Sequence, residues 1–253
     1  MAKVISISNQ KGGVGKTTTA VNLCTSLANL GQRVLLVDCD SQGNATSGLG
    51  LNRSTINRSV YDVLVNDLNP RAALQVTPYG VTILPASINL AAVEVELANL
   101  NLRETRLRAA LDSLRNDYDY IIVDCPPALG LLTINALTAV DAVIIPMQCE
   151  FFAMEGLAQL LKTIEIIKNN LNPLLFIEGI VMTMFDGRSK HNKDVIAEVR
   201  ATLGNLVYKT VIPRAIKISE AASYGVPILF YDKYSRIAKV YLKLAEEVLN
   251  RGR

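Results

Sequence analysis

A glycine-rich turn near the start of the chain carries two lysines and a run of threonines, in the order Asn-Gln-Lys-Gly-Gly-Val-Gly-Lys-Thr-Thr-Thr over residues 9–19. Glycines at positions 12, 13 and 15 permit a backbone path in which N–H groups approach phosphate oxygens closely, because no Cβ stands in the way. Lys16 can reach the outer phosphates of a nucleotide, and the Thr17 hydroxyl can bind Mg²⁺. These residue types at this spacing indicate a site for a phosphorylated ligand.

The turn departs from the common phosphate-loop pattern, G-x-x-x-x-G-K-[ST], at its first position. Gln10 stands where that pattern has glycine, and a second lysine, Lys11, precedes the glycines. The form K-G-G-x-G-K-[ST] is the deviant Walker A variant of the P-loop. Because an apolar strand precedes the turn and a helical run follows it, we favour this interpretation over a glycine-rich turn with incidental lysines. The predicted phosphate-binding residues are Lys11, Gly12, Gly13, Val14, Gly15, Lys16, Thr17 and Thr18.

Carboxylates follow two further apolar runs. Asp38 and Asp40 close one run, two residues apart and therefore on one side of an extended segment, and Asp124 closes the run Tyr-Ile-Ile-Val in the manner of a Walker B motif. Carboxylates beside a metal-bound triphosphate can orient the waters of Mg²⁺ or the attacking water. We favour these roles over simple solvated aspartates at strand ends.

Short β-branched runs alternate with longer helical patterns along the chain, and these elements must position the groups named above. Several runs are apolar on both faces, which is typical of a parallel sheet covered by helices on each side. We therefore predict an α/β, doubly wound, mostly parallel sheet, the P-loop NTPase fold, as a single domain over residues 1–253. The predicted strands are 4–7, 34–37, 81–84, 120–123, 142–145, 176–182, 206–211 and 228–230, and the predicted helices are 17–30, 59–65, 88–115 with a break, 130–138, 154–169, 192–203, 216–223 and 234–250.

Composition narrows the class of protein. The chain has 253 residues, 50% of them hydrophobic, and a formal charge of +3, which excludes a disordered tail protein. Its four cysteines lack metal-ligand spacing, so we expect reduced core thiols rather than disulfides or a zinc site. No apolar run has the roughly 20 residues that a membrane span needs, and the N-terminal apolar stretch is too short for a signal peptide. The chain is expected to be cytoplasmic.

Four motifs together resemble the ParA/MinD class of P-loop ATPases, and within it the Soj-type ParA proteins. They are the deviant Walker A turn, the stretch Asp-Cys-Asp-Ser-Gln-Gly-Asn from residue 38, the segment 145–156, and Ile-Pro-Arg-Ala-Ile-Lys from residue 212. The resemblance spans about residues 3–249 and implies an ATPase that forms an ATP-sandwich homodimer. It implies that Lys11 reaches the partner's nucleotide, that Lys16 and Asp40 serve hydrolysis, that Thr17, Asp38 and Asp124 serve Mg²⁺, and that Pro213 lies near adenine.

The chain departs from the family pattern at two of these positions. Ser41 replaces the usual proline after Asp40, and Ala215 replaces an asparagine that contacts adenine two residues after Pro213. The phosphate loop strand begins at residue 3, so we expect no N-terminal helix-turn-helix domain and no sequence-specific repression.

Charge is distributed unevenly. Residues 1–150 carry a net charge of −2, and residues 151–253 carry +5. The excess concentrates over residues 186–217, with few aromatic side chains among the basic ones, which favours contact with phosphate backbones over base stacking. The resemblance implies nonspecific binding of double-stranded DNA there, through Arg188, Lys190, Arg214 and Lys217, by a dimer that a ParB-like protein stimulates to hydrolyse ATP. A nucleoid-associated location follows from this prediction.

Two other functions are compatible with parts of the sequence. Ile237, Val240, Tyr241, Leu244 and Val248 repeat at helical spacing near lysines and arginines, as in a MinD-like ATPase that binds a membrane surface through a C-terminal helix. We favour packing of this stripe on the protein and expect no stable membrane association, because two glutamates interrupt the basic face. A DNA-binding module with a vestigial P-loop is the other alternative, and the intact phosphate loop opposes it.

Overall fold

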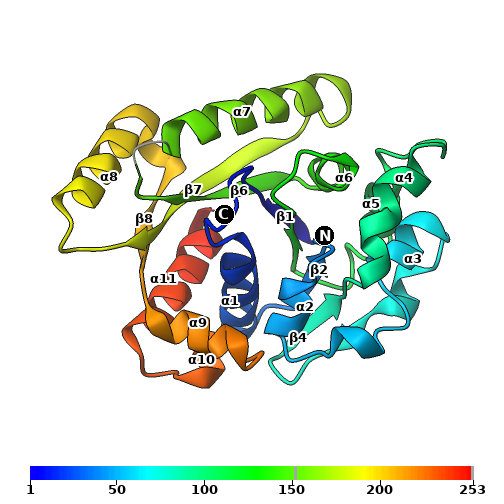
Figure 1. Ribbon diagram of the computed structural model, residues 1–253, viewed down its shortest axis with the longest axis horizontal. Coiled ribbons are helices and arrows are strands. Elements are labelled where there is room, and N and C mark those ends of the chain that lie inside the picture. The colour runs from blue at the N-terminus through cyan, green and yellow to red at the C-terminus, as the bar shows by residue number, and fades with distance from the viewer. Residues whose placement is uncertain (151–152, 252–253) are drawn as a thin grey trace.

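The computed structural model describes residues 1–150 and 153–251, so Phe151 and Phe152 of the 145–156 motif lie outside the described residues. Eight strands form one sheet in the order β3-β4-β2-β5-β1-β6-β7-β8 (Figure 1). The strands are β1 (Lys3–Ile7), β2 (Val34–Asp38), β3 (Gln75–Val76), β4 (Val81–Leu84), β5 (Tyr120–Asp124), β6 (Ala142–Gln148), β7 (Phe176–Phe185) and β8 (Val207–Pro213). Every neighbouring pair is parallel except β3 and β4. The predicted doubly wound, mostly parallel fold is confirmed.

Helices cover both faces of this sheet. One layer contains α3 (Val60–Val65), α4 (Val93–Leu97), α5 (Arg106–Asp112), α6 (Leu131–Ala139), α7 (Ala153–Asn170) and α8 (Lys190–Leu203). The other contains α1 (Lys16–Asn29), α2 (Asn44–Gly48), α9 (Ile216–Ser223), α10 (Ile228–Tyr231) and α11 (Arg236–Arg251). In Figure 1, α1 and α11 lie together below the central strands, and α7 runs above them.

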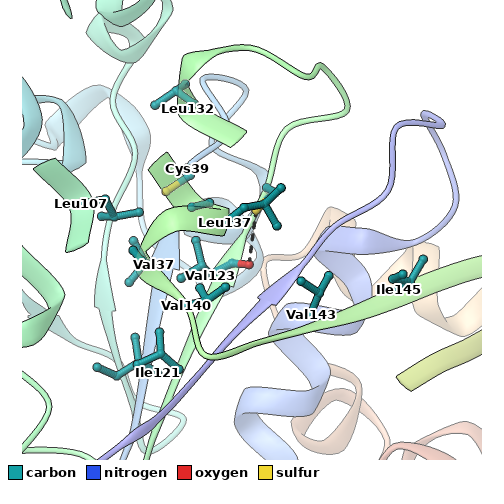
Figure 2. Close-up of a cluster of buried hydrophobic side chains, with 14 of the residues drawn as sticks. Val37, Cys39, Leu107, Ile121, Val123, Leu132, Leu137, Val140, Val143 and Ile145 are labelled. Carbon is teal, nitrogen blue, oxygen red and sulfur yellow. Dashed lines mark hydrogen bonds between the residues drawn. The ribbon is translucent and has the colours of Figure 1, made fainter. Parts of the chain in front are cut away.

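The strand pattern explains the two layers. Ile121 and Val123 of β5 belong to one buried cluster, whereas Tyr120 and Ile122 belong to the other, because successive side chains point to opposite faces. Figure 2 draws part of the first cluster, with labelled side chains from β2 (Val37), β5 (Ile121, Val123), β6 (Val143, Ile145), α5 (Leu107) and α6 (Leu132, Leu137). A strand buried on both faces cannot slip by one residue without exchanging its two faces, so the register at the carboxyl ends is fixed.

One predicted element was wrong, and two short elements were not predicted. Residues 228–230, predicted as a strand, form helix α10, where Pro227 precedes the first turn and the Ile228 backbone N–H donates to Asn22 Oδ1 at 2.8 Å. A short apolar run has too few residues for its period to separate a strand from a buried helix turn. The short strand β3 and helix α2 were not predicted, and the region 88–115 contains a 3₁₀ turn (Ile88–Ala92) before α4 and α5.

The C-terminal stripe packs on the protein, as favoured. Ile237, Tyr241, Leu244 and Val248 of α11 are each at most 3% exposed, and α11 contacts α1 and β8. In this arrangement the stripe does not face lipid. Within the described ranges, none of the helices combines the length and apolar character needed to cross a bilayer.

All four cysteines are free and buried, which confirms the expectation of core thiols.

Candidate nucleotide site and basic surface

The glycine-rich turn joins β1 to α1 with two residues in the left-handed region. Gly13 and Gly15 have φ values of 76° and 87°, which side chains rarely tolerate, and Gly15 immediately precedes the first helical residue, Lys16. No atom lies within 4 Å of a Cβ built on Gly12, Gly13 or Gly15, so the concave side of the turn is open. The open N-terminus of α1 and the turn's backbone together suit an anionic ligand.

Side chains from distant strands hold this turn in place. Gln148 Nε2 donates to the Gly13 carbonyl at 2.9 Å, and the buried Thr183 Oγ1 donates to the Val14 carbonyl at 2.9 Å. Asn9 Nδ2 donates to the Pro146 carbonyl at 2.7 Å, and Asn9 Oδ1 accepts from the Lys11 backbone N–H at 3.0 Å. Sequence reasoning missed Gln148 and Thr183, because no local pattern marks a residue that supports a loop from another strand.

A hydrogen bond to the Lys11 carbonyl holds the Lys16 side chain against the turn. This side chain is buried, and its Nζ donates to the Lys11 carbonyl at 3.1 Å. Burial lowers the pKa of Lys16, and the carboxylates of Asp124 and Asp40 oppose that effect. The Lys16 ammonium can exchange this carbonyl for a phosphate oxygen as its hydrogen-bond acceptor, because a hydrogen bond between two charged groups is stronger.

Asp124 is a buried carboxylate without a hydrogen-bond partner. Both of its oxygens are inaccessible to solvent and lack a partner among the described residues, while β5 places Asp124 in register with Ile7 of β1 and Asp38 of β2. Burial raises the pKa of Asp124 well above its ordinary value, and the nearby Asp38 carboxylate raises it further, although the neighbouring Thr17 hydroxyl and the Lys16 ammonium lower it. A cation would relieve both effects, so this carboxylate fits the neighbourhood of a metal ion.

Asp38 and Asp40 differ in what they contact. Asp38 Oδ2 accepts from the backbone N–H and the hydroxyl of Thr46, both at 2.7 Å, and Oδ1 accepts from the Asp40 backbone N–H at 3.2 Å. Burial raises the pKa of Asp38 to about 6, although the bonds from Thr46 lower it. Asp40 Oδ1 accepts from the Gln42 backbone N–H at 2.9 Å, and its carboxylate lines the open cavity at the turn. Asp38 therefore organises the loop, and Asp40 is free to face a ligand.

The oxygen atoms near the turn suit Mg²⁺, which needs few protein ligands, better than a metal ion that is held by protein side chains alone. Among the described residues, no three His, Cys, Asp or Glu side chains gather into a metal-binding group. Mg²⁺ in nucleotide sites uses few protein ligands, because phosphate oxygens and water complete its shell. Thr17 and Asp40 line the same cavity as the turn, and Asp124 is buried behind it.

Two cavities meet at the turn. One, of about 360 Å³, is lined by the phosphate loop, Asp40 and Pro127. The other, of about 340 Å³, is lined by Ile212, Pro213, Arg214, Ala215 and Tyr241. Gly15, Thr18 and Met184 line both, so the cavities are adjacent ends of one site. Pro213 and Ala215 line the second cavity together.

Met184 was not predicted as a site residue. It follows Thr183 near the end of β7 and has a φ of 53°, the left-handed region that non-glycine residues rarely occupy. The strand pairing between β7 and β8 is irregular between Met182 and Phe185. Backbone strain of this kind concentrates at ligand-binding positions, and here it places a methionine between the two ends of the site.

The Lys11 side chain pairs with a carboxylate outside the glycine-rich turn. Its Nζ forms an ion pair with Glu150 Oε2 at 2.6 Å, and the two side chains are 42% and 57% exposed. Glu150 follows β6, the strand that pairs with β1 on the side opposite β5. The second lysine of the turn is thus oriented by a carboxylate from a neighbouring strand end.

The predicted basic residues lie on exposed segments beside the base end of the site. Arg188 precedes α8, and its guanidinium pairs with Asp186 at 3.2 Å, while Lys190 begins α8. The Arg214 backbone N–H donates to the Phe185 carbonyl at 3.0 Å, which brings Arg214 next to the Arg188 loop. Lys217 on α9 pairs instead with Asp232. The structure therefore brings Arg188, Lys190 and Arg214 together more clearly than Lys217.

Comparison with known proteins agrees with this geometry. The AAA domain family model matches residues 2–177. The sporulation initiation inhibitor protein Soj of Bacillus subtilis is 53% identical over 253 residues, covering 100% of both chains. The chromosome partitioning protein ParA of Caulobacter vibrioides is 49% identical over 254 residues, covering 99% of this chain and 95% of its own.

Solved structures share the whole fold. Cobyrinic acid a,c-diamide synthase of Mycobacterium smegmatis, solved with a bound ATP analog and magnesium, has a TM-score of 0.90 and 40% identity, covering 100% of this chain and 96% of its own. The cell division ATPase MinD of Pyrococcus furiosus has a TM-score of 0.80 and 28% identity, covering 99% of each chain. The family model, the full-length relatives and the phosphate-loop geometry agree, and the chain belongs to the AAA domain family, among the Soj/ParA chromosome-partitioning ATPases.

Proposed function

We propose that this chain is an ATP-dependent switch for DNA partition, in which Mg-ATP joins two copies that bind DNA without sequence preference. The observation that carries the proposal is the open phosphate loop with the partnerless Asp124 behind it and a contiguous cavity for a base. A relative of the same fold was solved with an ATP analog and magnesium. That relative is named for cobyrinic acid a,c-diamide synthesis, but the relatives Soj and ParA, at 53% and 49% identity, support partition.

The residues of the site divide the work of hydrolysis. Backbone N–H groups of residues 12–16 and the ammonium of Lys16 would bind the phosphates, and the Thr17 hydroxyl and Asp124 would hold the metal directly or through water. Asp38, whose oxygens accept hydrogen bonds from Thr46 and the Asp40 backbone, would act on the metal through water while it holds the loop. The charge that develops on the transferred phosphoryl group would be neutralised by Mg²⁺ held there. Asp40 faces the same cavity and orients the attacking water. Lys11 completes the partner's site in the dimer.

Slow turnover fits the composition of the phosphate end. Among the described residues that line it, none is an arginine, and P-loop hydrolysis without an arginine finger can be as slow as about 10⁻⁴ per second. A stimulating partner of the ParB type would set the time at which DNA is released.

Salt arithmetic favours a dimer as the DNA-binding form. When salt rises from roughly 50 to 200 mM, DNA affinity falls about 3.5-fold for each phosphate that the protein neutralises. A protein that neutralises three phosphates therefore loses about 40-fold in affinity, and one that neutralises six loses about 10³-fold. A protomer with the basic residues 188, 190 and 214 binds feebly on its own. Joining two basic surfaces doubles the number of phosphates bound and makes binding depend on nucleotide.

Retention on unrelated double-stranded DNA fragments tests the proposal. We expect retention with ATP and magnesium, and little with ADP or without nucleotide, in parallel with a change from monomer to dimer in light scattering. Equal retention in all three conditions would overturn the switch.

A further inference from the structure

The ion pair between Lys11 and Glu150 joins the phosphate loop to the end of β6 within one protomer. We propose that Glu150 is a positioning residue that holds Lys11 in its own protomer until a partner's nucleotide displaces it. The proposal rests on the proposed function, because it assigns to Lys11 a destination in the second copy. It adds a residue, Glu150, whose carboxylate competes with the partner's phosphates for the same ammonium group.

Among the described residues, Lys11 is the side-chain partner of the Glu150 carboxylate. Its Oε2 lies 2.6 Å from Lys11 Nζ, and its side chain is 57% exposed, so it is not required to fill the core. Lys16, the other lysine of the turn, donates to the Lys11 carbonyl and remains inside the site. The two lysines therefore have separate anchors, and only the anchor of Lys11 is a carboxylate at the surface.

The end of β6 is itself fixed, so that Glu150 is presented at a defined place. Asn192 Nδ2 donates to the Cys149 carbonyl at 2.8 Å, and Gln148 Nε2 donates to the Gly13 carbonyl at 2.9 Å. Asn192 belongs to the first turn of α8, and its Oδ1 accepts from the Asp186 backbone N–H at 2.8 Å. Asn192 thus supports both the loop that carries Arg188 and the Lys11–Glu150 ion pair, which we call the latch.

An exposed ion pair of this kind is weak enough to open. Such pairs shift an equilibrium by about 1.4- to 5-fold, and a dimer breaks two of them, one in each protomer. A triphosphate offers Lys11 several negative oxygens in place of one carboxylate, so the exchange favours the ATP-bound dimer. Without a triphosphate across the interface, Glu150 keeps the lysine in its own protomer.

The test compares Glu150→Gln with the wild type by light scattering over a range of ATP concentrations with magnesium. Glu165→Gln is the matched control, because it removes an exposed carboxylate from α7. We expect Glu150→Gln to strengthen ATP-dependent dimerisation about 2- to 25-fold, to lower the ATP concentration at half-maximal dimer, and to leave turnover at saturating ATP within about 2-fold. Glu150→Asp should fall between the glutamine variant and the wild type.

The salt dependence of dimerisation distinguishes an electrostatic role of Glu150 from a merely structural one. The difference between Glu150→Gln and wild type should shrink from roughly 50 to 300 mM salt, because screening weakens the exposed pair. Asn192→Ala, which keeps the Glu150 charge but removes its support, should shift dimerisation in the same direction.

The outcomes separate the latch from the switch. If the wild type dimerises with ATP and Glu150→Gln behaves as Glu165→Gln does, the latch is wrong and the proposed function stands. If the wild type shows no ATP-dependent dimer, the proposed function itself fails. Weaker dimerisation of a folded Glu150→Gln would also overturn the latch, since it would give Glu150 a role in the dimer.

Discussion

The nucleotide site and the basic segment differ in how firmly a single copy of the chain fixes their side chains. At the phosphate loop, Lys16, Asp38, Asp40 and Asp124 are all at most 8% exposed, and distant strands fix the turn by hydrogen bonds. In the basic segment, the Arg188 side chain is 93% exposed, and its partner is the nearby Asp186. One region is organised before its ligand arrives, and the other is a set of solvated charges.

This difference separates two kinds of binding. The organised site places its groups at fixed positions, so each residue should matter strongly for chemistry. The solvated charges act through their number, so each should contribute modestly to DNA affinity and add a similar amount to the dependence of that affinity on salt. The following predictions test that contrast, from the largest effect to the smallest.

Replacing Asp40 with alanine should give the largest loss. We expect ATP hydrolysis to fall about 10²- to 10⁴-fold, because the water loses the group that orients it and accepts its proton. ATP binding should remain within about 3-fold, so that the variant stays on DNA after ATP is added. Phosphate release and filter retention measure the two properties. A variant with full turnover would remove Asp40 from the chemistry.

Replacing Lys16 with alanine should lower turnover about 10²- to 10³-fold and weaken nucleotide binding as well, since the ammonium supports the phosphates in both states. Equilibrium binding of a fluorescent ATP analogue and steady-state hydrolysis measure this. Lys168→Ala, on the last turn of α7, is the control that removes a lysine outside the site. Equal effects of the two variants would contradict the assignment.

Replacing Arg188 and Lys190 together should weaken DNA binding by about 10-fold near 100 mM salt and reduce the salt slope by about one for each phosphate that is no longer neutralised. Hydrolysis without DNA should stay within about 2-fold, because neither residue lines the site. Anisotropy titrations at several salt concentrations measure the slope. Arg103→Ala, an exposed arginine paired with Glu104, is the control; an unchanged slope in the double variant would sink the assignment.

Replacing Asp186 with asparagine should have the smallest effect and the opposite sign. The amide oxygen can still accept from the Arg188 backbone N–H, but the negative charge beside the guanidinium is gone. We expect DNA affinity to rise about 2- to 3-fold at low salt and to match the wild type at high salt. The same anisotropy titrations apply, and lower affinity would show that Asp186 has another role.

The organised region was also the one that sequence predicted best. Glycine spacing predicted the phosphate loop, and the apolar runs before Asp38 and Asp124 predicted that both residues end strands. The sequence did not predict that these two strands are neighbours, which the structure shows by placing Asp38 in register with Asp124. Gln148 and Thr183 could not be predicted, because they support carbonyls of residues 135 and 169 positions away in the chain. Residues 228–230 were misassigned because so short a run has no period of its own.

The place of β1 in the sheet has a consequence for how the protein is made. β1 lies between β5 and β6, both of which follow it in the chain, and pairs Lys3 with Tyr120 and Ile5 with Ala142. Its first neighbour, β5, is synthesised more than a hundred residues later, and loops of that length delay pairing. The base end waits longer still, for Pro213 and Ala215. The nascent chain must therefore extend past Ala215 before both cavities beside the glycine-rich turn can form.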